Sequence, residues 1–406
     1  MQDFLNKKMV VGVSGGIAAY KTALLVRELT RLGAVVRVVM TASAQQFITP
    51  MTFQALSGQD VRCDLFDAEA ERAMGHIELA RWADYLVIAP ASANCLAKMA
   101  HGLADDLLST LYLVFETPVV ICPAMNRSMW AHPATTTNVD ILTSRGALIV
   151  GPEEGSQACG EYGLGRMSDV DAIVNALRLL DVGPVLRGRR LLITAGTTRE
   201  PIDPVRYISN RSSGKMGYAL AEAARMAGAE VILVSGPTTL PAPQGVTTHC
   251  VNTAIEMCDA VMRNLEPGMI FVGAAAVADF TLAAPSGQKM KRQGREAMTL
   301  ELVATPDIVA TVVASQKAAY TVAFAAETHD VAQHAQLKLH AKQVDMVVAN
   351  QVGEGLGFDT DDNQVLVLTQ ERSVELPRLH KVRLAAQIMN ILAEQCHARE
   401  SFFLKE

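Results

Sequence analysis

The sequence predicts an α/β protein of two three-layer domains, at residues 1–188 and 189–406, and two observations predict it. The chain has 406 residues, half of them apolar, which is more than one hydrophobic core usually accommodates. Two segments, 9–39 and 191–234, open with the same pattern: an apolar strand, a glycine-rich turn, a helix, and a second strand reached through a Gly-Ala pair. Backbone N–H groups at such a helix start suit a phosphate. We therefore expect two Rossmann-like domains, each with a nucleotide-type site.

In the first domain, short apolar runs alternate with helical segments, which is typical of a parallel sheet buried on both faces. Further strands are expected at 35–40, 85–89, 119–122 and 148–150, and helices at 19–32 and 133–145. Near residues 181–190 the pattern breaks into glycine, proline and arginine. The boundary between the domains is therefore placed at residue 188.

The second domain repeats the alternation, with strands expected at 231–235, 269–275, 321–325 and 346–349. A glycine- and aspartate-rich loop at 353–363 leads into a hairpin at 364–369 and 373–375, and a closing amphipathic helix is expected at 382–396. The second sheet is therefore expected to be mixed.

Charge and hydropathy disfavour several classes of protein. The net charge is -6 and there is no basic tract, so a general nucleic-acid binder is disfavoured. No apolar run approaches the roughly 18 residues that span a membrane, and the first residues do not form a signal peptide. The seven cysteines include no Cys-x-x-Cys pair, which argues against a structural zinc site and a disulfide framework. A cytoplasmic protein without a membrane partner is expected.

The first domain carries polar or small residues after several strands, where α/β proteins bind ligands. Gly15 and Gly16 follow the first strand, Ser92 another and Asn126 a third. The alternative for the glycines is a simple strand–helix turn, and for Asn126 a turn residue. Residues 155–167 form a glycine-rich segment without helix or strand periodicity, typical of a mobile lid, and it contains Cys159. His76 fits either a helix start or a catalytic role.

Residues 9–180 resemble the flavin-dependent cysteine decarboxylases. The resemblance rests on Gly75-His76-Ile77-Glu78-Leu79, Pro123-Ala124-Met125-Asn126 and Ala158-Cys159-Gly160, in that order. It implies a flavoprotein domain with bound FMN, which takes electrons from the thiol-bearing carbon of a cysteine amide so that carbon dioxide can leave. It also implies that Cys159 is the proton donor, that Asn126 holds the substrate carboxylate and amide, and that His76 assists the oxidative half. Gly15, Gly16 and Ser92 are the expected FMN contacts.

The second domain contains a long polar loop before its first helix, with Arg206, Asn210, two serines and Lys215. Such a loop suits a phosphate, although an ordinary solvated loop is equally compatible with its composition. The segment 273–279 ends a strand with small residues and Asp279, near which a metal or a ribose can lie. Lys289 belongs to a polar run that also fits a surface charge cluster. Together these segments favour a nucleoside triphosphate.

Residues 189–400 resemble the phosphopantothenate–cysteine ligases, and the whole chain resembles the family of bifunctional bacterial coenzyme A biosynthesis proteins. The resemblance implies that CTP activates 4'-phosphopantothenate as an acyl-cytidylate and that the amine of cysteine then displaces CMP. The ligase product is the substrate of the decarboxylase, which yields 4'-phosphopantetheine. The implied CTP contacts are Gly273, Ala274, Ala275, Asp279, Lys289, Pro306, Asp307, Ile308, Val309, Phe324, Lys338 and Lys342.

The same resemblance implies further roles and partners. Lys289 would stabilise charge as the cytidylate forms, and Asn210 would act on the intermediate. Mg²⁺ would accompany the triphosphate, with Asp279 as the candidate ligand. A homo-oligomer is expected, with a dodecamer as a candidate form, because the flavin sites of this family lie between subunits.

Two other functions are compatible with parts of the sequence. A decarboxylase of peptide C-terminal cysteines joined to an unrelated ligase is disfavoured by the segment 210–217. A non-catalytic regulatory flavoprotein of the same fold is disfavoured because His76, Asn126 and Cys159 are present together.

Overall fold

The computed structural model describes residues 3–66, 75–180, 183–291, 297–353 and 360–403, without the side chains of residues 400–403. The chain divides into two compact units, Met1–Leu180 and Asp181–Glu406, and each is described by itself. The expected boundary at residue 188 lies inside the second unit. The turn before the first strand of that unit belongs to it, because Leu186 is buried and its N–H donates to Ala227 O at 2.8 Å.

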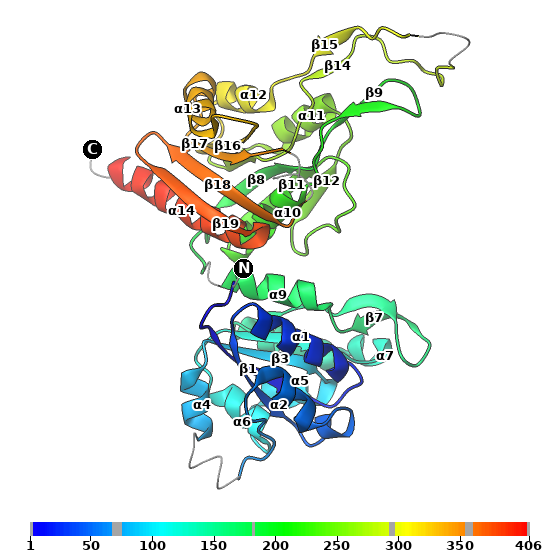
Figure 1. Ribbon diagram of the computed structural model, residues 1–406, viewed down its shortest axis with the longest axis vertical. Coiled ribbons are helices and arrows are strands. Elements are labelled where there is room, and N and C mark those ends of the chain that lie inside the picture. Colours follow the sequence, from blue (N-terminus) through cyan, green and yellow to red (C-terminus); the bar gives the residue numbers. More distant parts are fainter. Residues whose placement is uncertain (1–2, 67–74, 181–182, 292–296, 354–359, 404–406) are drawn as a thin grey trace. The chain divides into compact units, whose positions relative to one another are not determined.

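Unit 1 contains a five-stranded, wholly parallel sheet in the order β2-β1-β3-β4-β5 (Figure 1). The strands are β1 (Lys8–Val13), β2 (Val35–Met40), β3 (Tyr85–Ala91), β4 (Val119–Pro123) and β5 (Leu148–Ile149). The α-helices in the described part of unit 1 are α1 (Ala19–Arg31), α2 (Pro50–Ser57), α4 (His76–Trp82), α5 (Ala93–His101), α6 (Leu107–Val114), α7 (Arg127–Trp130), α8 (Pro133–Ser144) and α9 (Val170–Leu179). The predicted strands of this domain are therefore confirmed.

Both faces of this sheet are buried, which explains why its strands are continuous apolar runs. Met9 and Val11 of β1 belong to one core cluster, which also contains residues of α1, α2 and α9. Val10, between them, belongs to a second cluster with residues of α4, α5, α6 and α8. Successive side chains of a strand point to opposite faces, so the helices form a layer on each side of the sheet. The predicted three-layer architecture is confirmed.

The strand order creates one crevice in unit 1. From β1 the sheet continues to β2 on one side and to β3 on the other. The direction in which successive strands are added to the sheet therefore reverses between β1 and β3. In open α/β sheets, ligands bind at such a switch point, beyond the carboxyl ends of the strands. The turns that follow β1 and β3 are therefore the place to examine for a ligand site.

The glycine-rich segment 155–167 is not irregular, so the prediction of a segment without strand structure was wrong. It forms an antiparallel hairpin of β6 (Glu153–Ser156) and β7 (Tyr162–Arg166). Gly165 has φ 144°, and a Cβ there would lie 2.3 Å from Met125 O. Its own carbonyl accepts the Met125 N–H at 2.9 Å, so the backbones approach closely. Glycine is needed for that approach, and the glycines conceal the alternation by which strands are recognised.

Unit 2 contains an eight-stranded mixed sheet in the order β12-β11-β8-β13-β16-β17-β18-β19. The strands from β12 to β17 are parallel, and β17–β18 and β18–β19 pair antiparallel, as predicted. They are β8 (Arg190–Ala195), β11 (Glu230–Ser235), β12 (Thr247–Cys250), β13 (Ile270–Gly273), β16 (Tyr320–Glu327), β17 (Met346–Gln351), β18 (Asp362–Thr369) and β19 (Ser373–His380).

The helices of unit 2 are α10 (Lys215–Met226), α11 (Ala254–Asn264), α12 (Ile308–Ser315), α13 (Val331–Lys342) and α14 (Lys381–Phe403). The closing helix α14 packs beside α10, whereas α11, α12 and α13 pack in succession (Figure 1). The switch point of this sheet is the pair β8 and β13, since β11 and β12 lie on one side and β16 and β17 on the other.

Two hairpins leave the body of unit 2 (Figure 1). The 199–209 hairpin consists of β9 (Arg199–Pro201) and β10 (Tyr207–Ser209). The 280–304 hairpin consists of β14 (Phe280–Leu282) and β15 (Leu302–Ala304). Both present exposed apolar side chains, among them Val205, Tyr207 and Phe280. Within the described parts of both units, no helix is apolar and long enough to cross a bilayer.

Candidate functional sites

The turns after β1 and β3 are joined by one buried hydroxyl. Ser14, directly after β1, donates its hydroxyl to Pro90 O at 2.7 Å and accepts the Ser92 N–H at 2.8 Å. Gly15 and Gly16 follow, and α1 begins three residues later at Ala19. The structure thus brings Gly15, Gly16 and Ser92 together at the switch point of unit 1. Ser14 was missed in the sequence, where a serine directly after an apolar strand was the available signal.

This crevice fits the phosphate end of a flavin mononucleotide. A Cβ on Gly15 would lie 2.5 Å from Ser43 Cβ, so the turn has room only for glycine there. Gly16 has no atom nearer to such a Cβ than Pro90 Cγ at 3.9 Å, which leaves its surface open. The N-terminus of the 13-residue helix α1 opens at the same edge. Small side chains, a hydroxyl and a helix N-terminus together form a suitable phosphate cradle.

Asn126 and Cys159 lie together at the same carboxyl edge. Asn126 follows β4 and caps α7, because its Oδ1 accepts the Ser128 N–H at 2.8 Å. Its Nδ2 lies 3.5 Å from Cys159 Sγ, and Cys159 is exposed at the tip of the β6–β7 hairpin. An amide donor beside an accessible thiol can hold an anionic group and transfer a proton to the same bound molecule.

Two residues that the sequence analysis missed hold the Asn126 amide. Nδ2 of Asn126 donates to Glu161 Oε2 at 2.7 Å and to Gln157 Oε1 at 3.3 Å. Gln157 Oε1 also accepts the Arg127 N–H at 3.1 Å, and Glu161 Oε2 lies 3.5 Å from Arg127 Nε. Both flank Cys159 in the hairpin, and only the recognition of that hairpin would have indicated them.

His76 is not brought to Asn126 and Cys159 within one chain. It is the first residue of α4, which leads into β3 from the amino end of the sheet. In Figure 1, α4 and the β6–β7 hairpin lie at opposite sides of unit 1. A site that uses all three residues would therefore need His76 from another copy of the chain.

The switch point of unit 2 opens into a cavity of about 360 Å³. Ten of the residues predicted to bind CTP line it: Gly273, Ala275, Asp279, Pro306, Asp307, Ile308, Val309, Phe324, Lys338 and Lys342. Ala274 and Lys289 are not among the lining residues. Thr194, Phe271, Val277 and Thr305 also line the cavity and were not predicted. They come from strand interiors and loops that carry no distinct sequence signal.

Two lysines of α13 face the cavity from one side of the helix. Lys338 Nζ donates to Phe324 O at 2.7 Å, and burial lowers the pKa of its ammonium group. Lys342 pairs with Asp307, whose Oδ1 caps α12 by accepting the Ala310 N–H at 3.0 Å. Burial raises the pKa of Asp307, but the Ala310 N–H and Lys342 outweigh it, and the pKa lies below its ordinary value. The cavity therefore offers cations to a phosphate chain.

The metal prediction rests on Asp279 alone. Asp279 is exposed at the cavity rim. Among the described residues, no group of three or more His, Cys, Asp and Glu side chains could hold a metal ion. This donor set fits Mg²⁺ as it is bound with nucleotides, through one carboxylate, phosphate oxygens and water.

Asn210 contacts Val277 of the cavity lining, whereas two cations of its loop, Arg206 and Lys215, pair with carboxylates of this chain. Asn210 Nδ2 donates to Val277 O at 2.9 Å. Lys215 Nζ pairs with Asp361 at 2.7 Å, and Arg206 Nη1 lies 3.5 Å from Asp203 Oδ2. The predicted phosphate-gripping loop thus directs two of its cations toward carboxylates of this chain.

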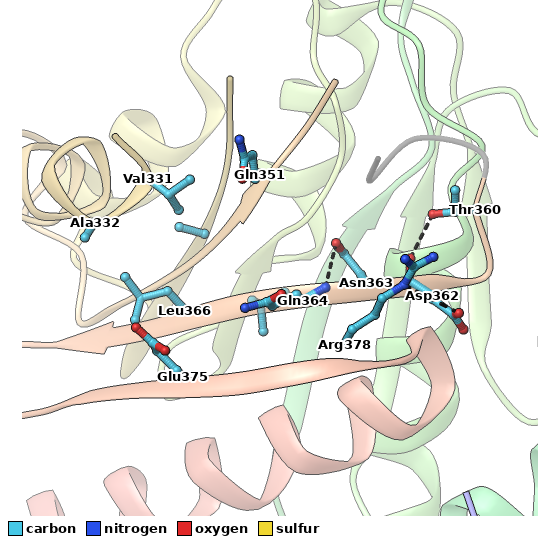
Figure 2. A pocket seen from close by; sticks show the side chains of 12 residues that line it. Val331, Ala332, Gln351, Thr360, Asp362, Asn363, Gln364, Leu366, Glu375 and Arg378 are labelled. Atoms are coloured by element: carbon cyan, nitrogen blue, oxygen red, sulfur yellow. Dashed lines mark hydrogen bonds and ion pairs between the residues drawn. The ribbon is translucent and has the colours of Figure 1, made fainter. Parts of the chain in front are cut away.

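A further hollow of about 330 Å³ lies over β17, β18 and β19 (Figure 2). Figure 2 shows Arg378 turned toward Asp362, and Arg378 Nε lies 3.7 Å from Asp362 Oδ2. None of the predicted site residues lines this hollow. In this hollow Arg378 and Asp362 pair with each other, whereas the predicted nucleotide residues gather at the switch point.

Fold and geometry define a two-domain α/β protein with a candidate site at the switch point of each domain. The family model "Flavoprotein" matches residues 2–179, and "DNA/pantothenate metabolism flavoprotein C-terminal domain" matches residues 186–396. The coenzyme A biosynthesis bifunctional protein CoaBC of Vibrio cholerae is 48% identical over 398 residues, which cover 97% of this chain and 100% of that protein. The CoaBC protein of Escherichia coli is 48% identical over 390 residues, 95% of this chain and 96% of that protein.

Among solved structures, the C-terminal domain of a CoaBC protein is 39% identical and covers 53% of this chain and 100% of that domain, with a TM-score of 0.45. The chain belongs to the family of bifunctional coenzyme A biosynthesis proteins.

Proposed function

We propose that the chain first ligates cysteine to 4'-phosphopantothenate with CTP and then decarboxylates the product to 4'-phosphopantetheine with FMN. The observation that carries this proposal is the cavity of unit 2, where ten of the predicted nucleotide residues meet. The pairing of Asn126 with Cys159 in unit 1 supports the second step. A regulatory flavoprotein would need neither arrangement.

In the ligase step, the carboxylate of 4'-phosphopantothenate attacks the α-phosphorus of CTP and pyrophosphate leaves. The amine of cysteine then attacks the acyl carbon, and CMP leaves with the electron pair of the broken C–O bond. Lys338 and Lys342, which line the cavity, would neutralise the triphosphate, and Asn210, which donates to Val277 of the lining, would orient the acyl group. Mg²⁺, when bound, would shield the phosphate charges, with Asp279 as its protein ligand.

In the decarboxylase step, FMN would supply the two-electron chemistry that makes loss of carbon dioxide possible. The switch-point turns of Gly15, Gly16 and Ser92 would hold its phosphate. The Asn126 amide would donate to the substrate, and Cys159 Sγ would give a proton to the carbon that lost the carboxylate. In the structure the Asn126 amide donates to Glu161 Oε2, and when substrate binds it would donate to the substrate carboxylate instead.

The chain is proposed to work in the cytoplasm as a homo-oligomer, with a dodecamer as a candidate form. Helix α4, which begins at His76, lies across unit 1 from the β6–β7 hairpin that carries Cys159, so a neighbouring copy would complete the flavin site. The exposed apolar side chains of the two hairpins of unit 2 offer a second contact surface. Light scattering of the purified protein is expected to show an oligomer, and a monomer that keeps FMN would contradict this assembly.

The direct test of the proposed function is mass spectrometry of the products. The protein is given 4'-phosphopantothenate, cysteine, Mg²⁺ and either CTP or ATP. Formation of 4'-phosphopantetheine with CTP supports both steps and the nucleotide preference. Accumulation of phosphopantothenoylcysteine would remove the second step, and no product with either nucleotide would favour the regulatory flavoprotein.

The affinity for CTP is expected to fall at alkaline pH. The pKa of Lys338 lies below its ordinary value because the side chain is buried, so its charge is lost at a lower pH than that of an ordinary lysine, as the pH rises through that lowered pKa. Calorimetric titration with CTP alone avoids the ionisation of the cysteine substrate. Lys338→Arg keeps a charge over this range and should flatten the profile, whereas the matched change Lys342→Arg should leave the decline in place.

A further inference from the structure

Asp203 is a buried carboxylate outside the nucleotide cavity. It sits in the turn of the 199–209 hairpin, and its side chain is fully shielded from solvent. Oδ1 accepts the N–H groups of Val205 and Arg206 at 2.8 Å and 2.9 Å, as is common for an aspartate in a turn. These two bonds account for only one of its oxygens.

The second oxygen reaches another part of the chain. Oδ2 accepts the Met290 N–H at 3.1 Å, across 87 positions of sequence. Arg206 Nη1, which lies 3.5 Å from the same oxygen, donates to Met290 O at 3.3 Å. Met290 is thus held at both its donor and its acceptor by the 199–209 hairpin.

A third bond joins the same two segments. The Ser286 N–H donates to Ile202 O at 2.9 Å, beside Asp203 in the turn. Lys289 lies between these two points of attachment, is exposed, and directly precedes Met290. Because consecutive Cα atoms are about 3.8 Å apart, anchoring Met290 on one side and Ser286 on the other restricts where the Cα of Lys289 can lie.

We propose that Asp203 is a positioning residue for Lys289: its carboxylate anchors the Met290 N–H and so sets where the Lys289 ammonium group is presented. The inference rests on the proposed function, in which Lys289 stabilises charge during cytidylate formation. Displacement of such a group by about 1 Å costs on the order of 100-fold in rate. A carboxylate that only stabilised the turn would need no bond to Met290.

The test is a double-mutant cycle on the full-length protein, measured as pyrophosphate release with CTP. Asp203→Asn keeps the size of the side chain and removes one of its acceptors. It should lower kcat by about tenfold or more while the KM for cysteine stays unchanged. In a Lys289→Ala background, Asp203→Asn should cause no further loss, because the side chain that it positions is gone.

Glu200→Gln is the matched control. Glu200 is buried in the same hairpin, but its Oε1 accepts the Ala254 N–H at 2.9 Å and caps α11 instead. The effect of Glu200→Gln on kcat should be the same in the wild-type and the Lys289→Ala backgrounds. Met290→Pro removes the anchored N–H from the donor side, and it should lower kcat even if Asp203→Asn does not fold.

The outcomes separate the inference from the proposed function. An equal loss from Asp203→Asn in both backgrounds, or full activity of Met290→Pro, would overturn the positioning role while the ligase function stands. Unchanged pyrophosphate release in Lys289→Ala would overturn the role of Lys289 itself, and the positioning role with it.

Discussion

Cys159→Ser is expected to stop formation of 4'-phosphopantetheine while the ligase step continues. The thiol lies 3.5 Å from Asn126 Nδ2 at the exposed tip of the β6–β7 hairpin, where a bound substrate can reach both groups. A hydroxyl is a weaker acid than a thiol, so proton delivery should slow by about 100- to 10,000-fold, the usual contribution of a positioned acid. Because this proton is delivered after carbon dioxide has left, mass spectrometry should show the decarboxylated enethiol, two hydrogens short of phosphopantetheine, and no phosphopantetheine.

Cys250→Ser supplies the control for this substitution. Cys250 is the other exposed cysteine, at the end of β12 in unit 2, and nothing places it in either site. Its replacement should leave both steps unchanged. Bound flavin, measured by absorbance, should be the same in both variants, because neither side chain belongs to the switch-point turns. Normal phosphopantetheine formation by Cys159→Ser would end the proton-donor assignment.

Asn210→Asp is expected to separate the two halves of the ligase reaction. Asn210 Nδ2 donates to Val277 O at 2.9 Å, and the substitution would set a carboxylate oxygen against that carbonyl. It would also add negative charge beside the phosphates and remove a donor from the acyl group. Loss of one such donor typically costs about 100- to 1,000-fold. Pyrophosphate release should persist in part, while amide formation slows by about that factor.

A pyrophosphate assay and mass spectrometry of the acyl products measure the two halves separately. Asn264→Asp is the matched control, because Asn264 Nδ2 makes the same kind of bond, to Ala260 O at 2.7 Å, at the end of α11. It should leave both halves intact. Equal loss of the two halves in Asn210→Asp would show that Asn210 does not act on the intermediate.

The sheets could be predicted from the sequence because their strands are buried on both faces. A strand such as β3, buried along its whole length, is a continuous apolar run that local patterns reveal. The β6–β7 hairpin could not be predicted, since Gly163 and Gly165 replace the side chains that would alternate. Its glycines are needed because other parts of the chain approach closely, and no local pattern records such an approach.

The candidate sites were predictable in part for a similar reason. Residues directly after strands, such as Ser92 and Asn126, meet at the carboxyl edge by topology alone. Contacts with distant side chains were not predictable: Lys215 pairs with Asp361, 146 positions away, and Met290 is anchored by Asp203. For His76 the reverse holds: its sequence motif made it a predicted site residue, but the fold of one chain does not bring it to Asn126 and Cys159.

Each unit builds its own switch-point site from its own strands. Under the proposed function, phosphopantothenoylcysteine therefore has to leave the site of one unit before the site of the other can bind it. Joining the two catalysts in one polypeptide then fixes their cellular ratio at one to one, whatever the level of expression. The fusion controls stoichiometry, whereas the chemistry of each step stays with its own domain.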